Sequence, residues 1–256
     1  MTTALVTGGT SGLGEAFAHE LARRGNNIVL VARDEEALAS VATVLHAKYG
    51  VDVEILRADL AHRDQTAVVV ARLLDQEHPV DTLVNNAGFG LYGSLLAEDL
   101  SEQERAMEVM VHAVLLLSNA AARAMAVRGS GTIINISSSS AWIYTGNYSA
   151  IKSWVLTFTK ALAVELEGTG VRVVASCPGW AKTNFHSRAG QKRPSLPAWA
   201  YVPVASVPRD ALACADSGKV VSVPHWPWKI AIWVAQHGPQ SIPRSFARKI
   251  TNSRKK

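Results

Sequence analysis

The most informative stretch of this 256-residue chain for its fold is Thr7-Gly8-Gly9-Thr10-Ser11-Gly12-Leu13-Gly14. It joins an expected strand at residues 4–7 to an expected helix at residues 12–24 that closes at Gly25. Glycines let the backbone pass close to a pyrophosphate, and a helix N-terminus offers free N–H groups and a partial positive charge. The spacing differs from the G-x-G-x-x-G fingerprint. The stretch therefore predicts a nucleotide phosphate loop, with a plain helix start as the alternative.

Short β-branched runs alternate with longer helical periods along the chain. Strands are expected at residues 4–7, 27–32, 53–58, 82–85, 131–136 and 171–176, and helices at residues 12–24, 35–48, 63–77, 102–126 and 148–167. Repeated β-α-β units predict an α/β fold: a Rossmann-like, doubly wound parallel sheet with helices on both faces, in a single domain. Within it we expect a dinucleotide-binding catalytic core at residues 1–183, a substrate lid and C-terminal segment at 184–225, and a basic aromatic tail at 226–256.

Tyr148 and Lys152 are four residues apart at the start of an expected helix, so they share one helix face. A free tyrosine, with a pKa of about 10, is a poor proton shuttle at neutral pH. A positive charge about 4 Å away stabilises the phenolate by about 4 kcal/mol at an effective dielectric of about 20. We therefore expect Lys152 to lower the pKa of Tyr148 and make it a general acid–base.

The composition, 48% apolar and 18% charged, is typical of a globular protein. No uninterrupted apolar run reaches the roughly 18 residues that cross a bilayer, and Met1 leads almost directly into the first strand, so no signal peptide is expected. Cys177 and Cys214 form no metal or redox spacing. We expect no metal site and a reduced, cytoplasmic setting.

The net charge of +5 is unevenly distributed. Residues 217–256 contain eight Lys or Arg and no acid, which gives +8, whereas residues 1–216 hold 18 basic and 21 acidic side chains, which gives −3. The basic excess belongs to the tail, so the pattern predicts no nucleic-acid partner for the core.

The second expected strand ends at Arg33-Asp34. A guanidinium matches the geometry of the 2′-phosphate of NADP. Asp34 is either the acid that binds the ribose of NAD or a helix N-cap. The pattern favours NADP(H), and NAD(H) is the alternative cofactor.

With these features the chain resembles the short-chain dehydrogenase/reductase superfamily, in its compact branch, over about residues 4–183. The resemblance rests on the Thr7–Gly14 loop, Asp59, Asn85-Asn86-Ala87-Gly88, a serine run at 137–140, Tyr148-x-x-x-Lys152 and Pro178-Gly179-x-x-x-Thr183. It implies reversible hydride transfer between NADP(H) and a small-molecule carbonyl or secondary alcohol, in a homodimer or homotetramer. The implied cofactor contacts are Thr7, Gly8, Thr10, Ser11, Gly12, Leu13, Gly14, Arg33, Asp59, Leu60, Asn86, Ala87, Gly88, Tyr148, Lys152, Pro178, Gly179 and Thr183.

The resemblance places the catalytic serine in the run at 137–140, and Ser138 is the candidate. Ser137 would point to the opposite side of a continuing strand, which leaves Ser139 or Ser140 as the alternatives. His112 stands where the family usually has an asparagine that anchors a water. It is either a titrating relay in the site or a packed helix histidine.

Residues 184–209 contain four prolines and no clean period, which predicts an irregular lid. The apolar side chains at 185–207 favour an apolar substrate or simply pack the lid. The aromatic and then basic residues from Trp226 onward predict a peripheral membrane contact, with helix packing or a subunit contact as alternatives. A non-catalytic dinucleotide sensor or scaffold and a sugar-nucleotide epimerase are the competing functions.

Overall fold

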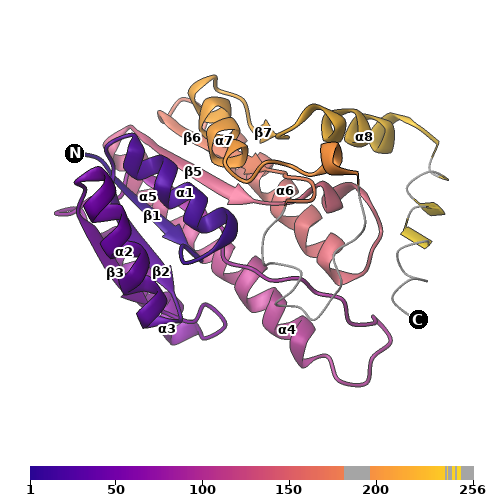
Figure 1. Cartoon of the computed structure of the whole chain (residues 1–256), viewed down its shortest axis with the longest axis horizontal. Helices are drawn as coiled ribbons and strands as arrows, with labels where there is room; N and C mark the ends of the chain where they lie inside the picture. The colour runs from indigo at the N-terminus through magenta and orange to yellow at the C-terminus, as the bar shows by residue number, and fades with distance from the viewer. Residues whose placement is uncertain (182–196, 240, 242–243, 246, 249–256) are drawn as a thin grey trace.

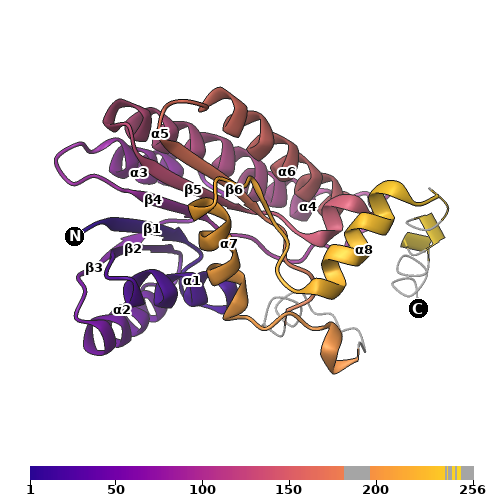
Figure 2. The same cartoon turned by 90° about the horizontal axis from the view of Figure 1, so that it is seen from above.

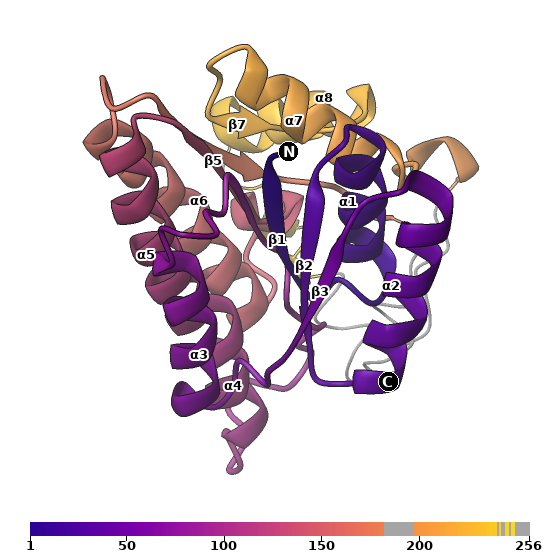
Figure 3. The ribbon, with the colours of Figure 1, turned by 90° about the vertical axis from the view of Figure 1, so that its left-hand side faces the viewer.

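A parallel sheet of seven strands, in the order β3-β2-β1-β4-β5-β6-β7, forms the centre of the computed structural model (Figure 3). The structure describes residues 1–181, 197–239, 241, 244–245 and 247–248. The strands are β1 (Thr3–Thr7), β2 (Asn27–Ala32), β3 (Val53–Arg57), β4 (Thr82–Asn85), β5 (Gly131–Ile136), β6 (Val171–Ser176) and β7 (Val221–Ser222). The strand order reverses between β1 and β4, which is the switch point where ligands bind in such sheets.

Helices cover both faces of the sheet (Figures 1 to 3). On one face lie α1 (Gly12–Arg23), α2 (Glu35–Tyr49) and α7 (Ser206–Asp216), and on the other lie α3 (Arg63–Leu74), α5 (Ala113–Arg128) and α6 (Asn147–Glu165). The short helix α4 (Ser101–Met107) leads into α5, and α8 (Trp226–His237) lies beyond α7. The predicted doubly wound fold is therefore confirmed.

Side chains of each central strand alternate between two buried clusters. Leu5 and Ile133 pack under α3, α5 and α6, whereas Val6 and Ile134 pack under α1, α2 and α7. Alternation places successive residues on opposite faces, and both faces are covered. This is why the strands read as near-continuous apolar runs.

The predicted boundaries hold best for the strands: β2, β4, β5 and β6 begin and end where the sequence pattern placed them. The expected helix at 102–126 differs, because a π-helical turn at Glu108–His112 separates α4 from α5. The chain after Pro178 is more regular than expected in its described part. It forms a 3₁₀ turn at Ala198–Ala200, then α7, β7 and α8.

Ser101–Arg128, which runs through α4 and α5, is long and apolar enough to cross a membrane. Most of it is buried inside the protein, and Met110, Leu117 and Met125 have no exposed surface. Packing against the sheet therefore accounts for its apolar character.

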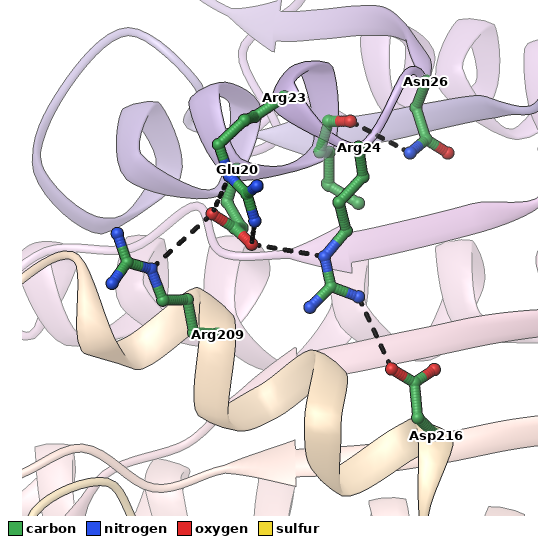
Figure 4. Close-up of polar contacts among 7 residues, drawn as sticks. Glu20, Arg23, Arg24, Asn26, Arg209 and Asp216 are labelled. Atoms are coloured by element: carbon green, nitrogen blue, oxygen red, sulfur yellow. Dashed lines mark hydrogen bonds and ion pairs between the residues drawn. The ribbon is translucent and has the colours of Figure 1, made fainter.

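A buried carboxylate joins α1 to α7 (Figure 4). Glu20 is 6% exposed and lies 2.6 Å from Arg23, 3.2 Å from Arg24 and 3.7 Å from Arg209 of α7. Arg24 also reaches Asp216 at the end of α7, at 3.5 Å. Hydrogen bonding from Arg23 holds the pKa of Glu20 below its ordinary value, against the opposing effect of burial. The network ties the late helix α7 to the first helix.

Candidate active site

A cavity opens at the carboxyl ends of the central strands, next to the switch point. Its walls come from the glycine loop, from the segments that follow β4, β5 and β6, and from the start of α6. The lining residues are Gly8, Ser11, Gly12, Leu13, Asn86, Gly88, Phe89, Gly90, Leu91, Tyr92, Ile136, Ser137, Ser138, Ser139, Ser140, Ile143, Thr145, Tyr148, Lys152, Pro178, Gly179, Trp180 and Ala181. Motifs that are distant in the sequence thus meet around one space.

The glycine loop brings the N-terminus of α1 to this cavity. Ser11, the N-cap of α1, makes no side-chain capping bond. A Cβ at Gly14 would lie 2.1 Å from the Gly8 carbonyl oxygen and 2.4 Å from the Asn86 amide nitrogen, so only glycine allows this close approach. An uncapped helix N-terminus beside a cavity fits the phosphates of a dinucleotide.

Thr7 and Asn86 connect the ends of β1 and β4. The Thr7 hydroxyl accepts hydrogen bonds from the backbone N–H groups of Asn86 (2.9 Å) and Ala87 (3.0 Å). The Asn86 amide donates to the Thr7 carbonyl at 2.9 Å. Thr7, Thr10, Gly14 and Ala87, predicted as cofactor contacts, do not line the cavity. Thr7 and Ala87 instead hold the loop in place.

Three of the four predicted catalytic residues lie together. The Ser138 hydroxyl is hydrogen-bonded to the Tyr148 phenol. The Lys152 ammonium lies 5.7 Å from the centre of the Tyr148 ring and donates to the Ile136 carbonyl at 2.9 Å. Ser137 donates instead to the Lys152 carbonyl, at 2.7 Å, so its hydroxyl is engaged with α6. Among the serines, Ser138 is therefore the one joined to the tyrosine.

The electrostatics differ from the prediction that Lys152 lowers the pKa of Tyr148. Burial raises the pKa of Tyr148, the Tyr92 phenol raises it further, and the Ser138 hydrogen bond opposes both. Burial also lowers the pKa of Lys152 to about 8. Desolvation is the largest cause of both pKa shifts, because Lys152 is 5% exposed and Tyr148 is partly buried in the cavity wall. At neutral pH the phenol is thus protonated, which is the form that donates a proton.

His112 lies outside the cavity lining. It ends the π-helical turn, and its ring nitrogen Nδ1 is 3.5 Å from Glu108, which in turn contacts Arg63 at 3.0 Å. These contacts are those of a half-buried residue in a surface charge network. A catalytic relay at His112 gains no support from them and stays a prediction.

A second cavity lies where β2 and β3 end, lined by Arg33, Arg57, Asp59, His62 and Gln65. Arg57 donates to the Arg33 carbonyl at 3.3 Å. Burial raises the pKa of Asp59, but the Ala61 N–H group and the Arg105 guanidinium, 2.9 Å from its carboxylate, bring the pKa below its ordinary value.

Asp34 and Leu60 have structural roles in this region. Asp34 accepts a hydrogen bond from the Ala37 N–H group at 3.0 Å, so it caps α2. Leu60, predicted as a cofactor contact, is buried in the core. Arg33, by contrast, is 67% exposed at the cavity edge.

The wall after β6 depends on a helix that the sequence did not reveal. A Cβ at Gly179 would lie 2.1 Å from the Trp228 ring of α8, and the Trp228 indole donates to the Ala200 carbonyl at 2.9 Å. The Pro178-Gly179 pair in the sequence gave no indication that Gly179 packs against Trp228, 49 residues later. Thr183, predicted to contact the nicotinamide, lies outside the described residues.

The fold and this cavity define a dinucleotide-binding oxidoreductase of the Rossmann type. Residues 2–194 match the sequence model of the short chain dehydrogenase family, and the chain belongs to that family. As a member, it is an oxidoreductase that acts on CH–OH and C=O groups with a nicotinamide dinucleotide. These matches do not favour a non-catalytic sensor or an epimerase.

Individual relatives agree with this assignment. An uncharacterized oxidoreductase of Staphylococcus saprophyticus is 36% identical over 183 residues, which cover 70% of this chain and 78% of that protein. A short-chain dehydrogenase from Sphingobium yanoikuyae, solved with NADPH, has a TM-score of 0.84 and 32% identity, and the match covers 96% of this chain and 95% of that one. The bulky-bulky ketone specific alcohol dehydrogenase from Comamonas testosteroni has a TM-score of 0.78 and 28% identity, with 92% of each chain covered.

Proposed function

We propose that the protein interconverts a bulky, apolar ketone and its secondary alcohol, with NADP(H) as the preferred cofactor. The observation that carries the proposal is the hydrogen-bonded Ser138–Tyr148 pair beside Lys152, in the cavity that also receives the N-terminus of α1. Proton-transfer groups and phosphate-binding groups thus share one space.

In the reductive direction, Ser138 and Tyr148 bind the carbonyl oxygen of the substrate. A nicotinamide dinucleotide bound in the cavity would supply the hydride for the carbonyl carbon. Negative charge then builds on the oxygen, where the two hydroxyl groups stabilise it, and Tyr148 donates its proton. The burial that keeps Tyr148 protonated at neutral pH favours this step.

The preference for NADP(H) rests on the second cavity. Arg33 and Arg57 bring two guanidinium groups to the ends of β2 and β3, where a dinucleotide's ribose lies in this fold class. Asp34, the acid that the sequence offers for the ribose of NAD, is engaged as the cap of α2, and Asp59 in the same cavity is paired with Arg105 and lies 3.8 Å from Arg33. Guanidinium groups recognise phosphate through paired hydrogen bonds, so the pair would hold a 2′-phosphate.

The apolar substrate is supported by the remaining walls. Phe89, Leu91, Tyr92, Ile143 and Trp180 contribute large aromatic and aliphatic side chains to the cavity, close to the catalytic pair. The similarity to a dehydrogenase described as specific for bulky-bulky ketones points in the same direction.

A panel of carbonyl compounds tests the proposal directly. Diaryl and alicyclic ketones, short aliphatic ketones, sugars and 2-oxo acids would be followed by NADPH absorbance, with NADH in parallel. We expect the highest kcat/KM for bulky apolar ketones with NADPH. Turnover restricted to sugars or acids would contradict the substrate class, and a preference for NADH would contradict the cofactor.

A further inference from the structure

The outer face of α8 carries a stripe of exposed aromatic side chains. Trp226, Ile230 and Trp233 are 63%, 55% and 62% exposed. His237 continues the stripe, and its ring stacks on Trp233 with centroids 5.2 Å apart. Spacings of four, three and four residues put all four on one side of a helix. With Trp199, which stacks on Trp226 at 6.5 Å and is 63% exposed, they form what we call the aromatic face.

The opposite side of α8 fixes the helix to the protein. Trp228 packs on Gly179, and Ile232 is 7% exposed. The ring nitrogen Nε2 of His225, just before the helix, is 2.7 Å from the Trp199 carbonyl oxygen. Through Trp228, α8 is thus packed on the wall of the active-site cavity. The helix lies at the end of the molecule opposite β3 (Figures 1 and 2).

Three exposed tryptophans together need an explanation, because an aqueous surface gains nothing from exposing large apolar side chains in a group. Tryptophan is enriched at membrane–water interfaces, where its ring lies among lipid headgroups. A helix that is apolar on one side and packed on the other can lie flat on such an interface.

The charge of α8 and of the sequence that follows it points to an anionic surface. Lys229 lies one turn from both Trp226 and Trp233, and residues 217–256 carry eight Lys or Arg and no acid. Basic residues next to an apolar helix face add about 1 kcal/mol each to binding of anionic lipid. A second copy of this chain fits less well, because a two-fold contact through α8 would bring the Lys229 side chains of the two copies toward each other.

We infer that the aromatic face of α8 docks on an anionic lipid membrane and places the active-site cavity next to the bilayer surface. Docking would give an apolar substrate a short path from lipid to the cavity. The inference stands on the exposed side chains of α8 and on the basic residues of the sequence at 217–256, so it holds or fails independently of the reaction.

Flotation of the full-length protein with lipid vesicles tests this inference. The vesicles would be phosphatidylcholine alone or phosphatidylcholine with phosphatidylserine, at low and high salt. We expect the wild type to float with the anionic vesicles and to lose binding on removal of phosphatidylserine or on addition of salt. The variant Trp226→Gln/Ile230→Gln/Trp233→Gln should bind at least about tenfold more weakly.

A matched control is the double variant Val127→Gln/Val164→Gln. Val127, near the end of α5, is 85% exposed, and Val164, near the end of α6, is 66% exposed. It should float like the wild type, and both variants should keep the wild-type circular dichroism and turnover in solution. Failure of the wild type to float, or equal flotation of the triple variant, would overturn the inference. So would a loss of oligomer in the triple variant without any vesicle binding, because a second copy would then cover the face. If the triple variant does not fold, flotation of the wild type with neutral vesicles and at high salt still tests whether the protein binds anionic lipid.

Removal of residues 226–256 would be a poorer test. Trp228 contacts Gly179 of the cavity wall, so truncation would disturb the active site together with the aromatic face. Substitutions on the outer side of α8 separate the two.

Discussion

At the scale of single residues, burial decides the acid–base properties of the site. The spacing of Tyr148 and Lys152 predicted that they share a helix face, and the family resemblance pointed to Ser138. The direction of the Tyr148 pKa shift could not be found in this way. Spacing shows that two groups are neighbours on a helix, but the loss of water around them depends on the walls contributed by distant segments such as Tyr92.

The lowered pKa of Lys152 predicts a specific pH dependence of stability. In the unfolded chain this lysine holds its proton to about pH 10.4, whereas in the folded protein it releases it near about 8. The unfolded state therefore binds more protons in this window, and the free energy of unfolding rises with pH. We expect Lys152→Met to lack about 1 kcal/mol of the rise that the wild type shows between about pH 8 and about pH 9.

Urea unfolding at a series of pH values measures this difference. The exposed residue Lys48 offers a control, since Lys48→Met should follow the wild-type curve. Parallel curves for the wild type and Lys152→Met would show that burial does not shift the pKa of Lys152.

The cofactor preference is also a residue-scale prediction. Arg33→Ala and Arg57→Ala should each lower kcat/KM with NADPH about 10- to 100-fold, the effect of one charge-assisted hydrogen bond. The kcat/KM with NADH should change little. Steady-state kinetics with each cofactor measures this difference between the NADPH and NADH effects. The control is Arg63→Ala, because Arg63 lies on α3 outside the second cavity. An equal loss with both cofactors would rule out a 2′-phosphate site.

At the scale of elements, regular β-α-β units could be predicted and the later helices could not. β2, β4, β5 and β6 are buried on both faces, so their apolar runs are unmistakable. α7 begins with Ser206-Val207-Pro208 after a proline-rich stretch, and its helical pattern is short. The π-helical turn at Glu108–His112 leaves no mark in the apolar spacing, because the segments on both sides continue to face the core.

The contact between α1 and α7 gives a prediction at this scale. Glu20→Gln removes a buried charge and its ion pairs with Arg23 and Arg209, while Arg24 keeps Asp216 as a partner, so we expect a loss of about 1–3 kcal/mol in the free energy of unfolding. Because the pKa of Glu20 is lowered, its contribution is present at neutral pH and is lost as the pH falls through that lowered value. The wild type and the variant should therefore converge in acid.

Thermal or urea unfolding at neutral and acid pH measures this effect. Asp216→Asn is the matched control, since this carboxylate is 63% exposed and its loss should cost less than about 1 kcal/mol. Equal losses for both variants would mean that the Glu20 network does not hold α7 to α1.

At the scale of the whole molecule, the residues of the proposed chemistry lie together at the carboxyl ends of the parallel strands. The carboxyl ends of β1, β4, β5 and β6 meet around the cavity, and the N-termini of α1 and α6 point their motifs into it. The sequence could predict this gathering, because parallel strands bring their ends to one side. It could not predict that α8 would complete the wall, since nothing in the apolar pattern links Trp228 to Gly179.

The oligomeric state and a cytoplasmic location stay predictions. Our proposal that Tyr148 transfers the proton, while the glycine loop and its neighbours bind the dinucleotide, depends on neither.

The most direct test of that claim is the paired measurement of turnover and NADPH binding in Tyr148→Phe. The substitution keeps the ring and removes only the hydroxyl. We predict that kcat for the best ketone of the panel falls about 10²- to 10⁴-fold, the contribution of a positioned general acid, while the Kd for NADPH from fluorescence titration changes less than about twofold. A Tyr148→Phe enzyme with ordinary turnover would contradict the account.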